Sequence, residues 1–141
     1  MSGPVRLLVV EDDESRVRNF RLWLPPEVRL VWAKNAGQAM GTLRRAEADT
    51  FAGLMLDHDL DHRTMTADGS RFTGTHVAHV IVERLRQSAP PVLVHSMNFS
   101  EGDAMAATLE RHGFPVTRIP MRELTRQSVL AWLDEVRDGM E

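Results

Sequence analysis

Stretches with a strand pattern alternate with stretches of helical pattern from one end of the chain to the other. The first, Val5 to Val10, is an almost unbroken apolar run of strand length, which is typical of a strand covered on both faces. The expected elements, in chain order, are strand 5–10, helix 14–24, strand 28–33, a helix capped by Asn35 and ending near Ala48, strand 51–56, helix 73–87, strand 91–95, helix 100–112, strand 115–119 and helix 121–137. Because crossovers between parallel strands are right-handed, five such units predict an α/β fold: a parallel, doubly wound sheet with helices on both faces.

The composition is that of an ordinary globular protein. With 141 residues, of which 43% are hydrophobic and 26% charged, we expect residues 1–141 to form a single domain with a substantial core. The net charge of −3 argues against binding of long nucleic acids or of membrane surfaces. No cysteine is present, which excludes disulfides and thiolate metal sites. The amino terminus lacks the pattern of a signal peptide and no apolar run reaches membrane-spanning length, so we expect a cytoplasmic protein.

Polar side chains gather where the expected strands end. They are Asp12 and Asp13 after the first strand, Asp57, His58 and Asp59 after the third, His95, Ser96 and Asn98 around the end of the fourth, and Arg118 at the end of the fifth. Ligands of open α/β sheets bind at this edge, near the point where the strand order reverses. Carboxylates that converge there repel one another unless a cation lies among them. Oxygen ligands suit a hard divalent cation, so we predict that Mg²⁺ or Mn²⁺ is bound by Asp12, Asp13, Asp57 and Asp59.

The same edge carries groups suited to phosphate chemistry. A divalent cation polarises a phosphoryl oxygen and neutralises the charge that develops on it. We predict phosphate contacts from Ser96, Asn98 and Arg118, and proton transfer near neutral pH by His58 or His95. Other interpretations stay open for single residues: an aspartate at position 13 precedes a helix and is a candidate cap, and a histidine at position 95 is a candidate partner for a backbone carbonyl.

These features resemble the receiver domains of two-component response regulators, over nearly the whole chain. In that family an acidic pair after the first strand binds Mg²⁺, and it matches Asp12 and Asp13 here. The phosphoacceptor aspartate that ends the third strand matches Asp57, and the hydroxyl residue that ends the fourth matches Ser96. The resemblance implies a flavodoxin-like sheet with strand order 2-1-3-4-5.

One feature of ordinary receivers is missing. They carry a lysine before a proline after the fifth strand, where it holds the phosphoryl group, and this chain has Ile119 at that position. Lys34, after the second strand, is the only lysine among the 17 basic residues. Arg118 is therefore a candidate substitute.

Two histidine motifs point to a particular group of receivers. They are Leu56-Asp57-His58-Asp59-Leu60 and Val94-His95-Ser96-Met97-Asn98, accompanied by Thr73-Gly74 and Met105. The combination resembles the atypical group called cyclic-phosphate processing receiver domains, whose members are proposed to act on cyclic phosphate ends of RNA. The resemblance implies metal-assisted opening of a cyclic phosphodiester. His58 or His95 would activate water, or Asp57 would attack directly, and the other histidine would protonate the leaving ribose oxygen.

Two further interpretations remain. In the first, the chain is a stand-alone receiver that is phosphorylated on Asp57 and signals through a protein partner. The absent lysine counts against it. In the second, the chain is a pseudo-receiver that serves only as a binding scaffold, and the three acidic residues Asp12, Asp13 and Asp57 count against that interpretation.

Overall fold

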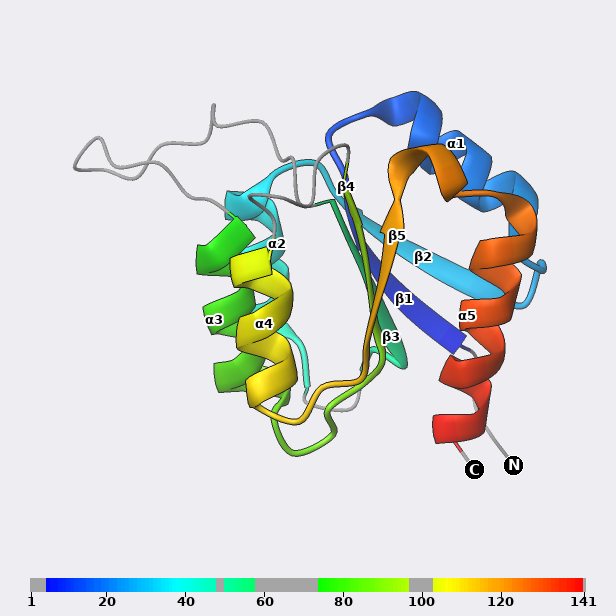
Figure 1. The fold of residues 1–141 in the computed structure, drawn as a ribbon. Helices are drawn as coiled ribbons and strands as arrows, with labels where there is room; N and C mark the ends of the chain where they lie inside the picture. Colours follow the sequence, from blue (N-terminus) through cyan, green and yellow to red (C-terminus); the bar gives the residue numbers. More distant parts are fainter. Residues whose placement is uncertain (1–4, 48–49, 58–73, 97–102, 141) are drawn as a thin grey trace.

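The computed structural model of the chain describes residues 5–47, 50–57, 74–96 and 103–140. In these ranges a five-stranded parallel sheet has the order β2-β1-β3-β4-β5, with helices on both faces (Figure 1). The elements are β1 (Val5–Val10), α1 (Glu14–Trp23), β2 (Val28–Ala33), α2 (Ala36–Arg45), β3 (Gly53–Asp57), α3 (Gly74–Leu85), β4 (Val92–Ser96), α4 (Asp103–Arg111), β5 (Val116–Pro120), a 3-10 turn η1 (Met121–Glu123) and α5 (Arg126–Gly139). The predicted fold class and strand order are confirmed.

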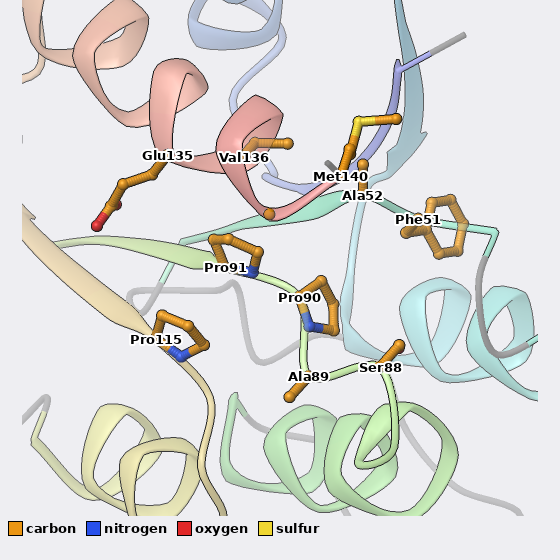
Figure 2. A pocket seen from close by; sticks show the side chains of 11 residues that line it. Phe51, Ala52, Ser88, Ala89, Pro90, Pro91, Pro115, Glu135, Val136 and Met140 are labelled. Atoms are coloured by element: carbon orange, nitrogen blue, oxygen red, sulfur yellow. The ribbon is translucent and has the colours of Figure 1, made fainter. Parts of the chain in front are cut away.

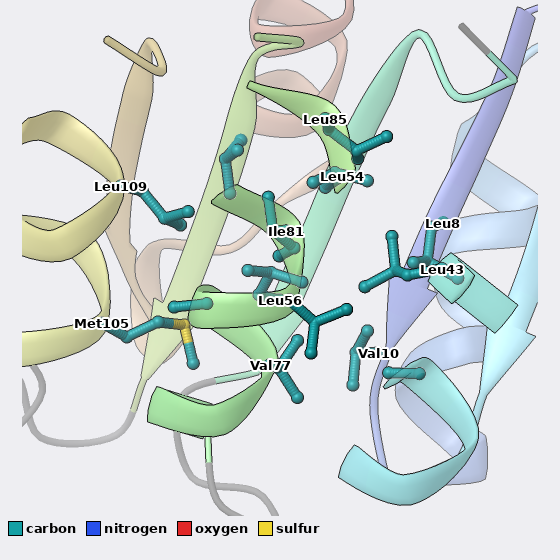
Figure 3. Close-up of a cluster of buried hydrophobic side chains, with 14 of the residues drawn as sticks. Leu8, Val10, Leu43, Leu54, Leu56, Val77, Ile81, Leu85, Met105 and Leu109 are labelled. Atoms are coloured by element: carbon teal, nitrogen blue, oxygen red, sulfur yellow. The ribbon is translucent and has the colours of Figure 1, made fainter. Parts of the chain in front are cut away.

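The central strands send alternate side chains into two separate cores. Leu8 and Val10 of β1 face α2 and α3, together with Leu54 and Leu56 of β3 (Figure 3). The residues of opposite parity pack under α1 and α5 on the other face of the sheet, as Figure 1 shows. They include Leu7, Val9, Met55 and Leu93 from the sheet and Phe20, Trp132 and Leu133 from the helices. Burial on both faces explains why these strands have almost continuous apolar sequences.

Two helix starts illustrate the local chemistry. Asn35 caps α2, as predicted, because its side chain accepts a hydrogen bond from the Gln38 amide. The prediction of one helix over 121–137 was wrong at its start. A 3-10 turn comes first, and α5 begins only after Thr125, which forms a capping box with Ser128. That reciprocal pair requires an extended Thr125, so a helix cannot run through it.

Several predicted features fall outside the described residues. They are the loop that follows Asp57 as far as Arg71, the helix start at Thr73 and the first residues of the helix predicted from Ser100. No helix in the described part of the chain is long and apolar enough to cross a membrane.

Candidate functional site

Glu11 is held firmly at the carboxyl end of β1. Its amide donates to the carbonyl of Ala33 at 3.1 Å, and its carbonyl accepts the indole N–H of Trp32 at 2.7 Å. Both partners belong to β2, so the backbone of Glu11 continues the sheet beyond the last residue of β1. Its side chain is completely buried.

Three buried side chains meet at this edge, and we call them the acid–histidine cluster: Glu11, Asp57 and His95. Asp57 ends β3 and is in register with His95 of β4. One ligand atom from each of the three lies within 4.8 Å of the others. The His95 Nε2 atom lies 2.9 Å from Glu11 Oε1, and the imidazole packs edge to face on Phe20 at 5.7 Å between ring centroids. The histidine therefore forms part of the polar site and does not bind a backbone carbonyl through Nε2.

Arg16, in the first turn of α1, lies beside the cluster. Its Nε donates to Glu11 Oε1 at 2.7 Å. Its Nη2 lies 3.9 Å from Asp57 Oδ2 and its Nη1 lies 3.6 Å from Asp13 Oδ2. One guanidinium therefore spans three carboxylates, two of them fully buried.

These contacts control the ionisation of Glu11. Burial raises the pKa of Glu11, but hydrogen bonds with His95 and Arg16 outweigh that effect and bring the pKa far below its ordinary value. Burial also lowers the pKa of Arg16, and the hydrogen bond and charge of Glu11, with the charges of Asp57 and Asp13, more than restore it. The site thus contains an ionised carboxylate and a charged guanidinium in direct contact.

Of the two aspartates predicted as the acidic pair, one caps a helix. Asp13 is the N-cap of α1: its Oδ1 accepts from the Ser15 amide at 2.9 Å and from the Arg16 amide at 3.3 Å. The Ser15 hydroxyl also donates to Asp13, and with the two amides it lowers the pKa of the Asp13 carboxyl. Asp12 is exposed. The acidic member from this segment inside the cluster is Glu11, which the sequence reasoning missed.

The missed signal is the two-residue alternation of a strand. Val5, Leu7 and Val9 all face the α1 and α5 side of the sheet. Extending the same alternation by one step places Glu11 on that side, level with Asp57 and His95.

The remaining predicted residues fall into two groups. Ser96 is fully buried at the end of β4. Arg118 is in register with Val94, which places it on the α4 side of the sheet, where it forms an ion pair with Glu110. The position next to His95 in β5 is taken by the buried Ile119. His58, Asp59 and Asn98 lie outside the described residues.

The donor set fits a divalent cation. Two carboxylates and one imidazole converge within the reach of a single ion. Carboxylate oxygens suit Mg²⁺, and an imidazole added to them makes Mn²⁺ a better match. Glu11 and Asp57 are the described carboxylates that would hold such an ion, and His95 is a third donor within reach.

One cavity in the described part of the chain lies at the opposite end of the sheet. It has a volume of about 400 Å³ and is bounded by Pro90, Pro91 and Pro115, with Val136 and Met140 of α5 (Figure 2). These prolines precede β4 and β5, so the cavity lies at the amino ends of the strands. Its lining is mainly apolar and contains no cluster of titratable groups, so the chemistry belongs to the acid–histidine cluster.

Comparison with known proteins agrees with this geometry. The family model described as "Cyclic-phosphate processing Receiver domain" matches residues 6–111. No curated protein matches the chain. Among solved structures, the signal receiver domain of an HD domain-containing protein from Pseudomonas fluorescens Pf-5 is similar, with a TM-score of 0.70, 14% identity and 96% of each chain covered.

Two other solved structures show the same fold. The receiver domain of a sensor histidine kinase from Pseudomonas aeruginosa PAO1, which has a magnesium ion coordinated in the active site cleft, gives a TM-score of 0.68 at 16% identity and covers 95% of this chain and 97% of that one. The response regulator domain of Thermotoga maritima CheB gives 0.65 at 19% identity, with 96% of each chain covered.

Proposed function

The chain belongs to the family of cyclic-phosphate processing receiver domains, and from that membership we propose that it opens cyclic phosphate ends of RNA or of nucleotides by metal-assisted hydrolysis. In the reaction, water adds to phosphorus and one ester bond to a ribose oxygen breaks. That oxygen takes up a proton, and the product is a phosphomonoester.

The observation that carries the proposal is the buried contact between His95 and Glu11 beside Asp57. A site that needs only to bind Mg²⁺ has no use for an imidazole among its carboxylates. Hydrolysis of a phosphodiester needs a group that exchanges protons near neutral pH, and histidine is the side chain suited to that task. The His95 Nε2 atom lies 2.9 Å from Glu11 Oε1, so the carboxylate fixes the orientation of the ring.

Each side chain of the cluster has a defined task in this proposal. An ionised Glu11 accepts the proton of His95 Nε2, which leaves Nδ1 as the ring atom that takes up or delivers a proton. Nδ1 is buried and makes no hydrogen bond to any residue in the described ranges. Glu11 and Asp57 would hold the divalent cation, which supplies charge neutralisation at the phosphoryl oxygens when it is bound. His58 remains the predicted second histidine.

Phosphorus NMR of an oligonucleotide with a 2′,3′-cyclic phosphate end tests the proposal. The substrate is incubated with the protein in Mg²⁺ or in Mn²⁺, and with Asp57→Asn and His95→Gln variants. His79→Gln serves as a matched control, because His79 is exposed on α3. We expect metal-dependent ring opening that both cluster variants lose and the control keeps, and the product shift reveals which ester bond breaks. A spectrum that stays unchanged with the wild-type protein in either metal would overturn the proposal.

One observation favours a second function, that of a phosphorylated signalling module. Asp57 is buried at the end of β3 in a fold shared with response-regulator receivers, which is the place where a receiver carries its phosphoacceptor. Incubation with acetyl phosphate and Mg²⁺, followed by intact-mass measurement, tests this alternative. A stable gain of one phosphoryl group that Asp57→Asn abolishes, without ring opening, would favour signalling over hydrolysis.

A further inference from the structure

Arg16 is placed at the border between the buried cluster and solvent. Its side chain is 29% exposed, whereas the side chains of Glu11 and Asp57 are fully buried. Its Nε is committed to Glu11. The two Nη groups approach Asp13 and Asp57 at 3.6 and 3.9 Å and make no hydrogen bond to a residue in the described ranges. The Nη groups of the guanidinium are therefore donors next to the cluster that a ligand could use.

A phosphate group bound at this site needs a positively charged side chain to offset its negative charge. A phosphoryl group next to Asp57 adds negative charge to a site that already holds the carboxylates of Glu11 and Asp57. Arg118 is joined to Glu110 on the α4 side, and Lys34 lies over the ring of Trp32. Among the described residues, Arg16 is the arginine whose side chain contacts these carboxylates.

A divalent cation held by Glu11 and Asp57 would compete with Arg16 for the same two carboxylates. Glu11 Oε1 already receives both Arg16 Nε and His95 Nε2. Two positive charges sharing Glu11 and Asp57 repel each other, so a bound cation weakens the hold of these carboxylates on the guanidinium. A phosphoryl group offers paired oxygens that match the fork of the Nη groups, and Arg binds such oxygens in bidentate fashion.

We propose that Arg16 is the phosphate-binding cation of this site: it exchanges the carboxylates of Glu11 and Asp57 for phosphoryl oxygens once those carboxylates hold a divalent cation. Arg16 thus supplies from α1 the positive charge that Ile119 cannot supply from β5. The inference deepens the proposed function and rests on it, because it assigns the substrate's phosphate group to a residue of the same cluster.

Opposite effects on metal and on phosphate binding test the proposal. Isothermal titration calorimetry measures the binding of Mn²⁺ alone, and phosphorus NMR measures the binding of inorganic phosphate at saturating Mg²⁺. The variants are Arg16→Gln, Arg16→Lys and the matched control Arg18→Gln, since Arg18 is exposed on the same helix. Arg16→Gln removes the competitor for the carboxylates, so it should bind Mn²⁺ about tenfold more tightly, the equivalent of one charge-assisted hydrogen bond. It should bind phosphate about tenfold more weakly, and Arg16→Lys should recover part of that loss.

The outcomes separate this inference from the proposed function. An Arg16→Gln variant that binds Mn²⁺ and phosphate like the wild type would overturn the role of Arg16 and leave the hydrolysis proposal intact. Loss of both Mn²⁺ and phosphate binding would also overturn it, because a side chain that only supports the site weakens both. A wild-type protein that binds neither Mn²⁺ nor phosphate would overturn the proposed function and this inference together. Urea unfolding of each variant establishes that the compared proteins are folded.

Discussion

Replacing Glu11 by glutamine tests the centre of the cluster with the smallest possible change in shape. The carboxylate accepts hydrogen bonds at both oxygens: Arg16 Nε and His95 Nε2 at Oε1, and the Asp13 amide at Oε2. A glutamine side chain has one oxygen, so its NH₂ group must face at least one of these donors. It also removes the negative charge from the bond with Arg16.

The expected destabilisation follows from these contacts. One hydrogen bond is lost with a buried donor left facing an NH₂ group, at about 1–3 kcal/mol. The bond to Arg16 changes from charge-assisted to ordinary, which costs about 1 kcal/mol more. Removing Glu11's charge also relieves its repulsion with Asp57, so we expect a net loss of about 2–3 kcal/mol in the free energy of unfolding.

Urea unfolding at pH 7 in EDTA, followed by tryptophan fluorescence, measures this loss without a contribution from metal binding. Glu14→Gln is the matched control: Glu14 is exposed in the first turn of α1, and its loss should change stability by less than about 0.5 kcal/mol. A Glu11→Gln variant as stable as the wild type, or more stable, would mean that repulsion from Asp57 outweighs the pairs with His95 and Arg16. That result would refute the reasoning.

The difference in unfolding free energy between the wild type and Glu11→Gln should depend on pH, in a direction that follows from the lowered pKa of Glu11. The pKa of Glu11 is lowered in the folded protein, so its ionised form contributes stability above the unfolded value of about 4.3. That contribution is lost as the pH falls from there toward the lowered folded pKa. The stability gap between wild type and Glu11→Gln should therefore be constant from about pH 7 to pH 5 and should narrow below about pH 4.

Three other substitutions probe neighbouring features. Asp13→Ala should lower the free energy of unfolding by about 1 kcal/mol, because the α1 cap is lost. The affinity of the protein for Mn²⁺ should stay within about twofold. A large loss of Mn²⁺ affinity would show that Asp13 is a metal ligand after all. Gly53→Ala should cost about 1–3 kcal/mol in urea unfolding, because its new Cβ would lie 2.9 Å from two side chains of α5, whereas Gly139→Ala, with open space around its Cβ, should be neutral or stabilising by about 0.5 kcal/mol. Arg118→Gln should leave phosphate binding, measured by phosphorus NMR, unchanged within about twofold, because Arg118 lies on the α4 side with Glu110.

The sequence predicts the sheet well because burial on both faces leaves a strong signal. Val5–Val10 and Val28–Ala33 coincide with β1 and β2, and the alternation of strands with helices predicts a parallel sheet. Helix ends depend on the competition between single hydrogen bonds, and there the prediction is weaker. The apolar spacing through α5 does not reveal that Thr125 and Ser128 cap each other and end the preceding turn.

In the candidate site too, the sequence pattern predicts some residues, whereas others depend on the exact register of a strand. Strand ends indicate that Asp57 and His95 approach each other, and the structure places them in register on adjacent strands. The acidic run 11–13 contains three carboxylates at successive positions, and a one-residue difference in register decides which enters the site. The two-residue alternation of β1, continued from Val9, predicts that Glu11 enters the site. Asp13 instead caps α1, because its side chain accepts hydrogen bonds from amides in the first turn of the helix.

Arg16 could not have been found by such counting. The chain has 16 arginines, and an arginine three residues beyond a helix cap is ordinary on a helix surface. Only the three-dimensional approach of α1 to the end of β3 brings its Nη2 within 3.9 Å of Asp57.

Because Arg16 lies on helix α1, its proposed role predicts which part of the protein responds to phosphate binding. When Arg16 binds phosphate, the side chain that moves belongs to the first turn of α1, next to the Asp13 cap. Arg118 instead lies on the α4 side of the sheet, with Glu110. Amide hydrogen exchange in the presence of inorganic phosphate and Mg²⁺ should therefore change in the first turn of α1 and stay constant in β5. Equal changes in β5 would indicate that the phosphate signal reaches the strand-five surface, as a signalling receiver requires. Changes confined to α1 favour a site that processes its phosphate ligand locally.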